Sequence, residues 1–156
     1  MIGFGYDLHR LAEGETLILG GVQIPSDTGT VAHSDGDVLI HAICDAILGA
    51  AGMGDIGEHF PDTDEQYKNA DSSKLLQDVL KMIREEALEI VNIDSTIILE
   101  KPKLKQYKIK ITENLAMICS LGRERINIKA TTNEKTGPVG RGEAIAVYSV
   151  CMLKEK

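Results

Sequence analysis

The chain has 156 residues and a mass of 17.0 kDa, which is enough for one domain and too little for two ordinary ones. Its hydrophobic share of 43% and charged share of 26% are typical of a globular domain, and 17 basic against 24 acidic residues give a net charge of −7. So acidic a chain, with 4% aromatic residues and no Trp, is a poor nucleic-acid binder, and its charge argues against a polyanionic ligand held by charge alone.

The start of the chain and its cysteines bear on the compartment. Residues 1–10 show no charged stretch followed by an apolar run and a cleavage site, and no apolar run approaches the ~18 residues of a membrane span. Cys44, Cys119 and Cys151 are widely spaced in apolar stretches, which is typical of buried thiols in a reducing compartment. We therefore expect one domain, residues 1–156, in the cytoplasm, with neither a membrane nor a nucleic acid as partner.

Hydrophobic periodicity predicts a chain in which strands and helices are mixed. In chain order we expect strands at 2–7 and 16–24, a helix from an N-cap at Ser34 to about Gly52, a loop over 53–71, a helix from about Ser72, a strand at 90–99, a helix at 106–121, and strands at 125–131 and 143–153. Long loops inside compact domains are usually functional. The order favours an α/β fold of the two-layer α+β type, with a mixed β-sheet and helices packed on one face.

Asp7 and His9 are the first candidates for chemistry. Residues two apart in a strand point to the same side, so this carboxylate and this imidazole converge. Such a pair suits a divalent metal of the zinc type, but a metal site needs a third ligand. Without one, an isolated Asp-x-His is a surface pair.

His41 lies on the first predicted helix, with Asp37 and Asp45 four residues away on either side. Carboxylates one turn away are well placed to orient an imidazole that binds a metal. An exposed helix face with favourable charge pairing is the alternative, and these residues alone leave both open.

Two polar segments are candidates for anion binding. Residues 33–37 (HSDGD) place a histidine, a hydroxyl and backbone N–H groups at a predicted helix N-terminus, although a plain N-cap needs only Ser34. Residues 129–135 (KATTNEK) lead two hydroxyls, an acid and a base into a glycine-rich turn, where glycine allows close backbone approach to a ligand. A polar hairpin would explain the glycines but not the Thr-Thr-Asn-Glu cluster, and Arg141 could equally be a surface charge that pairs with Glu143.

Together these segments resemble the 2-C-methyl-D-erythritol 2,4-cyclodiphosphate synthase family of the non-mevalonate isoprenoid pathway. The resemblance covers nearly the whole chain, and the pieces become specific because all of them occur in order at these spacings. They are residues 5–9 (GYDLH), 32–37 (AHSDGD), 54–57 (GDIG), 60–64 (FPDTD), 129–132 (KATT) and 140–143 (GRGE).

The resemblance implies a metal-dependent site. Asp7, His9 and His41 would bind zinc, with the fourth position left for a phosphate oxygen. Glu134 would help to hold a second divalent cation, magnesium or manganese, and His33 and Thr132 would stabilise the transition state. The implied substrate-binding residues are Asp7, His9, His33, Ser34, Asp55, Ile56, Gly57, Phe60, Pro61, Asp62, Thr63, Asp64, Leu99, Glu100, Lys101, Pro102, Lys103, Leu104, Lys105, Thr131, Thr132, Asn133, Glu134 and Arg141.

The resemblance also implies a reaction and an assembly. In the family, the 2-phosphate of 4-diphosphocytidyl-2-C-methyl-D-erythritol 2-phosphate attacks the β-phosphorus and CMP leaves. Residues 55–57 and 60–64 would surround the methylerythritol, while 99–105 would hold the cytosine from a neighbouring subunit of a homotrimer. Because the attacking phosphate is already anionic, catalysis reduces to positioning and charge neutralisation.

Two other functions are weighed against this one. A zinc-dependent phosphatase or phosphodiesterase would need a group near the zinc that activates water, and only His33 could serve. A non-catalytic trimer that binds isoprenoid diphosphates would carry structural zinc, which normally has four protein ligands rather than three.

Overall fold

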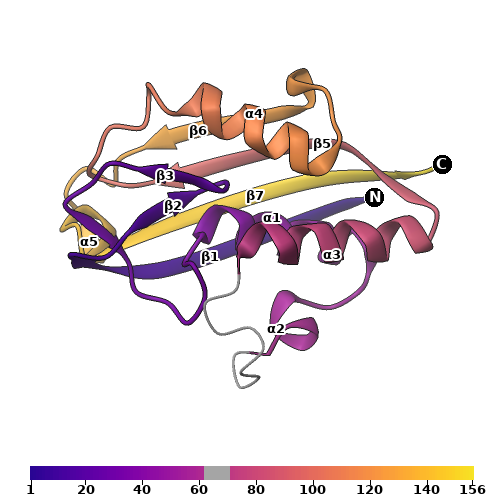
Figure 1. Cartoon of the computed structure of the whole chain (residues 1–156), viewed down its shortest axis with the longest axis horizontal. Coiled ribbons are helices and arrows are strands. Elements are labelled where there is room, and N and C mark those ends of the chain that lie inside the picture. Colours follow the sequence, from indigo (N-terminus) through magenta and orange to yellow (C-terminus); the bar gives the residue numbers. More distant parts are fainter. Residues whose placement is uncertain (62–70) are drawn as a thin grey trace.

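A computed structural model describes residues 1–61 and 71–156, and its centre is a five-stranded mixed sheet (Figure 1). Across the sheet the order is β4-β1-β7-β5-β6. The pair β5–β6 is parallel, and the other neighbours are antiparallel. The strands are β1 (Ile2–Glu13), β4 (Thr28–Thr30), β5 (Leu88–Ile98), β6 (Ile126–Thr131) and β7 (Ala144–Glu155).

Three helices cover one face of this sheet, and both chain termini lie at the same end of it (Figure 1). These helices are α1 (Val38–Ala51), α3 (Ser72–Glu85) and α4 (Lys108–Cys119). Shorter turns are α2 (Ile56–His59), a 3₁₀ turn at Arg123–Arg125 and α5 (Gly137–Gly140), which packs on the opposite face. The predicted mixed α/β architecture, with the main helices on one face, is confirmed.

Several predicted boundaries are wrong for identifiable reasons. Residues 16–24 do not form one strand but a separate hairpin, β2 (Leu17–Leu19) and β3 (Val22–Ile24), because Gly20 and Gly21 both have positive φ and make its turn. The predicted loop over 53–71 contains α2, while β4 and α5 are too short to give a periodic signal. The first strand also runs to Glu13, well beyond its predicted end.

Asp37, not the predicted Ser34, caps the first helix. Its fully buried carboxylate accepts the backbone N–H of Ile40 at 3.0 Å, and those of Gly20 and Gly21 at 3.0 and 2.6 Å. Burial raises the pKa of Asp37 to about 6, although the three N–H donors act in the opposite direction. One carboxylate therefore fastens the β2–β3 turn to the start of α1.

Gly3 and Gly5 allow α1 to lie directly against the backbone of β1. Both are on the buried, helix-facing side of the strand. A Cβ at Gly3 would lie 1.9 Å from the carbonyl oxygen of Ala46, and one at Gly5 would lie 2.0 Å from that of Ala42. Any other residue would push the helix outward, so these glycines determine how closely α1 approaches the strand.

We predict that Gly5→Ala lowers the free energy of unfolding by about 3 kcal/mol, because the added methyl overlaps the backbone of α1 and forces the helix away. A matched control is Gly49→Ala within α1, where the nearest atom to a new Cβ is 3.9 Å away. That control should be neutral or stabilising because Ala favours helix. Urea denaturation at one protein concentration measures both variants, and equal midpoints for the two would contradict the close-packing argument.

Candidate active site

Asp7 and His9 on β1 meet His41 on α1. Each residue offers one ligand atom, and these atoms lie within 4.8 Å of one another. Asp7 Oδ2 is 3.2 Å from His9 Nδ1 and 3.1 Å from His41 Nδ1. Zinc–ligand bonds of about 2.0–2.2 Å at tetrahedral angles separate neighbouring ligand atoms by roughly 3.4 Å. These two separations therefore suit a metal ion placed between these side chains.

An unpaired nitrogen in this cluster points to the same conclusion. His9 Nδ1 is buried, and although Asp7 Oδ2 lies 3.2 Å away, no hydrogen bond satisfies this nitrogen among the described residues. A buried polar atom without a partner is costly and calls for an explanation. A metal ion would use that lone pair, so the residues present fit a divalent cation.

The carboxylate of the cluster has the charge that a metal ligand requires. Burial alone would raise the pKa of Asp7, but the hydrogen bond from His41 and the two imidazoles outweigh it and hold that pKa well below its usual range. Burial alone would lower the pKa of His41, but the bond to Asp7 and that carboxylate's charge raise it. Asp7 is therefore ionised, as a ligand must be.

Of the two interpretations left open for His41, orientation by Asp37 and Asp45 is not the one that the described contacts contain. Asp37 caps α1, and Asp45 accepts the backbone N–H of Ile56 at 2.8 Å. The Nε2 atom of His41 instead lies 3.0 Å from Ser72 Oγ and 3.5 Å from Ser34 Oγ. Sequence reasoning missed Ser72 because it begins a different helix, 31 residues further along the chain.

The segment before α1 does not provide the free helix N-terminus that was predicted. The helix begins at Val38, and the carboxylate of Asp37 already binds the backbone N–H of Ile40. His33 is exposed, and Ser34 Oγ accepts the N–H of Gly36 at 3.2 Å. Contact between this segment and phosphate thus remains a prediction based on its own side chains and loop backbone.

The segment at α2 is anchored to the metal-site helix. Asp55 caps α2 by accepting the N–H of Glu58 at 3.0 Å, and Ile56 is tied to Asp45 of α1. Phe60 is half-buried against the hydrophobic core. Ile56 is half-buried, whereas Gly57 and Pro61 are exposed, and the predicted residues Asp62, Thr63 and Asp64 lie outside the described residues.

A cavity of about 370 Å³ lies where β5 and β6 end. Most of the predicted segment 99–105 lines it, together with two predicted threonines. The lining residues are Leu99, Pro102, Lys103, Leu104, Lys105, Lys108, Ala130, Thr131 and Thr132. Lys108 and Ala130 were not predicted to line this cavity. Lys108 could have been found from the sequence, because it begins the helix that follows the predicted segment 99–105.

Glu100 organises the loop beside this cavity instead of lining it. Its Oε1 accepts the backbone N–H of Asn133 at 2.8 Å and of Lys135 at 3.3 Å. The side chain of Asn133 donates to the carbonyl of Thr136 at 2.9 Å. Thr132 Oγ1 donates to Glu134 Oε1 at 3.2 Å. The residue predicted to stabilise the transition state therefore contacts the residue predicted to hold the second cation.

Two predicted residues have other surroundings. Lys101 is exposed and does not line the cavity. Arg141 forms an ion pair with Glu143, from Nε to Oε1 at 2.7 Å and from Nη2 to Oε2 at 3.1 Å. Of the two interpretations offered for Arg141, the pairing with Glu143 is the one that the described contacts contain.

The metal cluster and the cavity lie apart within one chain. The register places Asp7 opposite Val147, Val147 opposite Ile97, and Ile97 opposite Ala130. Three strand spacings separate the two ends of this row, roughly 14 Å. Because Val147 and Ile97 are fully buried, core side chains fill the helix-facing side between them.

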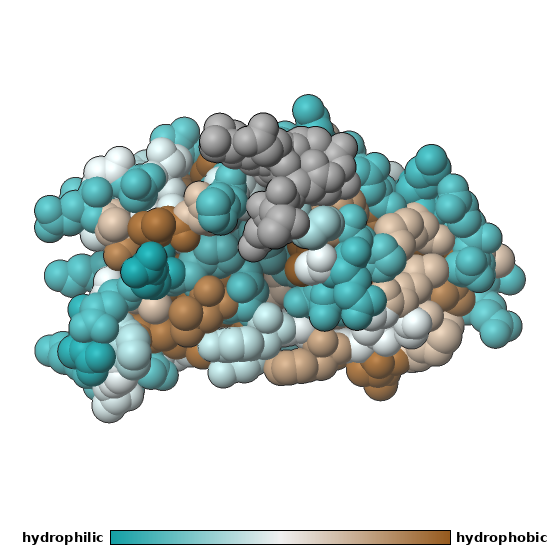
Figure 2. Space-filling model, turned by 90° about the horizontal axis from the view of Figure 1, so that it is seen from below, coloured by the Kyte–Doolittle hydropathy of each residue, from teal (hydrophilic) through white to brown (hydrophobic). Residues whose placement is uncertain are grey.

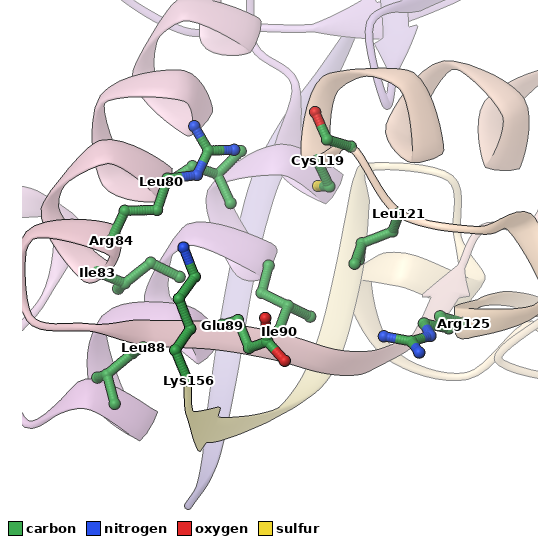
Figure 3. Close-up of a pocket in the computed structure, with 11 residues that line it drawn as sticks. Leu80, Ile83, Arg84, Leu88, Glu89, Ile90, Cys119, Leu121, Arg125 and Lys156 are labelled. Atoms are coloured by element: carbon green, nitrogen blue, oxygen red, sulfur yellow. The ribbon is translucent and has the colours of Figure 1, made fainter.

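A second cavity, of about 250 Å³, lies at the other end of the sheet near the C-terminal Lys156 (Figure 3). Its lining combines apolar side chains such as Leu80 and Ile83 with Arg84 and Arg125, which Figure 3 shows on different elements. None of the predicted site residues lines it, so it is separate from the candidate active site.

Comparisons with known proteins agree along the whole chain. The model of the YgbB family matches residues 1–154. A 2-C-methyl-D-erythritol 2,4-cyclodiphosphate synthase of Clostridium novyi (strain NT) is 50% identical over 155 residues, covering 99% of both chains. In the described residues no helix is long and apolar enough to cross a membrane.

Solved structures give the same result. The structure of a 2C-methyl-D-erythritol-2,4-cyclodiphosphate synthase in its CDP-bound form is 34% identical, with a TM-score of 0.92, and covers 99% of this chain and 100% of its own. The bifunctional IspDF of Campylobacter jejuni is 49% identical with a TM-score of 0.96, and the match covers 99% of this chain and 42% of that one.

We predict that Asp7→Ala removes tight binding of a divalent metal. The wild-type chain should retain about one zinc ion after dialysis, and the variant should retain less than about a tenth, because two imidazoles alone make an incomplete site. Asp94→Ala is the control, since Asp94 pairs with Lys129 at a partly exposed position. Elemental analysis of dialysed protein measures the ratio, and equal zinc in wild type and Asp7→Ala would rule out this cluster as the site.

Proposed function

The chain belongs to the YgbB family, and we propose that it converts 4-diphosphocytidyl-2-C-methyl-D-erythritol 2-phosphate into 2-C-methyl-D-erythritol 2,4-cyclodiphosphate and CMP. It is an enzyme of the non-mevalonate isoprenoid pathway, as are its full-length relatives. The observation that carries this function is the full-length family match combined with the meeting of Asp7, His9 and His41 in space.

Asp7, His9 and His41 would hold the zinc ion that this reaction requires. A zinc ion bound there supplies a Lewis acid that orients and polarises a phosphoryl oxygen. Three protein ligands leave a coordination position open for that oxygen, as in other catalytic zinc sites. Glu134, an exposed carboxylate beside Thr132, would help to hold the second cation, magnesium or manganese.

The cavity at the ends of β5 and β6 would receive the cytidine. Leu99, Pro102 and Leu104 give it apolar walls for the base, and Lys103, Lys105 and Lys108 give it positive charge for the phosphates. Thr131 and Thr132 offer hydroxyls on the opposite wall. By this proposal, apolar side chains, lysines and threonine hydroxyls from two neighbouring segments recognise the nucleotide.

The chain needs no general base for this chemistry. The attacking 2-phosphate oxygen is already anionic, so the protein has only to align it with the β-phosphorus and neutralise charge on the departing CMP. In this scheme His33 and Thr132 donate hydrogen bonds to the phosphoryl oxygens as negative charge builds up on them. Residues 55–57, at the start of α2, and Phe60 would surround the methylerythritol part of the substrate.

Product analysis tests this reaction. We expect CMP and the cyclic diphosphate in equal amounts, and Thr132→Ala should lower kcat by about 100-fold because one donor to the transition state is lost. Thr112→Ala, one turn into α4 and outside the lining of the cavity, should match wild type. Release of inorganic phosphate without a cyclic product would instead indicate a phosphatase. Binding of the substrate without turnover would indicate a non-catalytic protein.

The uncovered face of the sheet supports assembly of this chain into a homotrimer. On that face β1 and β7 expose Ile2, Phe4 and Tyr6 directly opposite Met152, Val150 and Tyr148. The ring of Tyr148 lies 5.0 Å from that of Tyr6, so the patch is continuous. Exposed apolar patches of this kind mark protein contacts. Figure 2 looks at the edge of the sheet rather than onto this face, and there hydrophobic side chains are scattered among largely hydrophilic ones.

The distance between the metal cluster and the cavity at the ends of β5 and β6 supports the same assembly. Within one chain, core side chains fill the space between the metal cluster and the nucleotide cavity, so one substrate cannot easily span both. We therefore propose that each active site lies between subunits. The cluster of Asp7, His9 and His41 would come from one single-domain chain and the cavity from its neighbour.

Phe4→Glu tests this assembly. Its side chain is 61% exposed in the isolated chain, so the charge should leave the fold intact but break the contact. Wild type should sediment at three times the 17.0 kDa chain mass, and the variant at one chain mass, with activity at least 10-fold lower. Met117→Glu on α4, 72% exposed and far along the helix from Lys108, is the matched control. A fully active trimer of the Phe4 variant would place the contact elsewhere.

A further inference from the structure

Ser72 connects a proposed metal ligand to a carboxylate on a different segment. Its Oγ lies 3.0 Å from Nε2 of His41 and donates to Oδ1 of Asp35. Although it is polar, Ser72 is completely buried, at 0% exposure. His41, Ser72 and Asp35 therefore form a continuous chain of polar contacts that runs from α1 to the start of α3 and back to the loop before α1.

The position of Asp35 is fixed independently of this chain. Its Oδ2 accepts the backbone N–H of Ser72 at 2.9 Å, and its Oδ1 accepts that of Asp37 at 3.1 Å. An ionised carboxylate can only accept hydrogen bonds. The hydroxyl proton of Ser72 is therefore committed to Asp35.

The direction of that bond decides which proton His41 carries. Because the hydroxyl of Ser72 has given its proton to the bond with Asp35, its oxygen can only accept from Nε2 of His41. In the metal-free protein Nδ1 donates to Oδ2 of Asp7 at 3.1 Å. A histidine that binds a metal is neutral and has one N–H, so an N–H kept on Nε2 by Ser72 would leave the lone pair of Nδ1 for the metal.

We propose that Ser72 and Asp35 are positioning residues that hold His41 with Nδ1 as its metal-binding atom. This proposal rests on the metal site proposed above and goes beyond it by naming what orients the ligand. Hydrogen-bond partners of ligating histidines fix the ring and its tautomer, and their loss typically costs 10- to 100-fold in metal affinity. Ser34 Oγ is a poorer partner, because it lies 3.5 Å away and already accepts the N–H of Gly36.

The role can be separated from simple support of the fold. Ser72→Ala removes only the hydroxyl and keeps the bond from its backbone N–H to Asp35. The adjacent Ser73→Ala is a matched control, since no side-chain hydrogen bond of Ser73 is found among the described residues. Ser72→Thr keeps a hydroxyl and serves as the conservative rescue.

The first measurement is the affinity of each full-length protein for Zn²⁺, by competition with a chromophoric chelator. We expect Ser72→Ala to bind 10- to 100-fold more weakly, and Ser72→Thr and Ser73→Ala to stay within about 3-fold of wild type. Thermal unfolding of the metal-free proteins should show Ser72→Ala folded at the assay temperature. Equal affinity for wild type and Ser72→Ala would overturn the proposal.

The second measurement is NMR of the zinc-loaded wild type labelled with ¹⁵N-histidine, which does not depend on any variant folding. The His41 proton should be on Nε2 and protected from exchange with water. A proton on Nδ1 would overturn the proposal. If wild type fails to bind Zn²⁺ at all, the metal site itself fails. Zinc that binds tightly without any dependence on Ser72 would leave the reaction standing and remove only the positioning role.

Discussion

The contact between α1 and the backbone of β1 is the constraint on which the rest of the structure depends. Gly3 and Gly5 remove the side chains that would hold the helix off the strand. The next two residues on the same face are Asp7 and His9, and the facing turn of the helix carries His41. The strand periodicity that buries two glycines thus also places two candidate metal ligands on the same face, and the helix that packs on the glycines carries the third.

The acidic composition takes on a different meaning once each carboxylate has a place. Asp37 holds a turn against a helix, Glu100 holds the loop beside the proposed nucleotide cavity, and Asp35 binds Ser72. Asp7 and Glu134 would bind divalent cations, which reverse the local sign of the charge. A net charge of −7 therefore excludes a nucleic-acid partner more convincingly than it excludes a small diphosphate.

The sequence predicted those features that depend on local periodicity or on a long family resemblance. The four longer strands of the sheet, the three long helices and the convergence of Asp7 with His9 are of this kind. Contacts between segments that are distant in the chain could not be predicted from the sequence. Periodicity places Asp37 and Asp45 beside His41, but the tertiary fold turns both toward backbone N–H groups elsewhere and brings in Ser72. Short elements such as β4 and α5 are held by their neighbours, so their own residues carry little signal.

The placement of the two chain ends has a consequence for gene fusion. Because β1 and β7 are adjacent and antiparallel, Ile2 pairs with Met152 and both ends emerge at one side of the sheet. The proposed nucleotide cavity lies at the ends of β5 and β6, away from this side. A further domain could be joined by a linker without covering that cavity. The bifunctional Campylobacter jejuni protein, in which this fold occupies 42% of a longer chain, is an arrangement that such geometry permits.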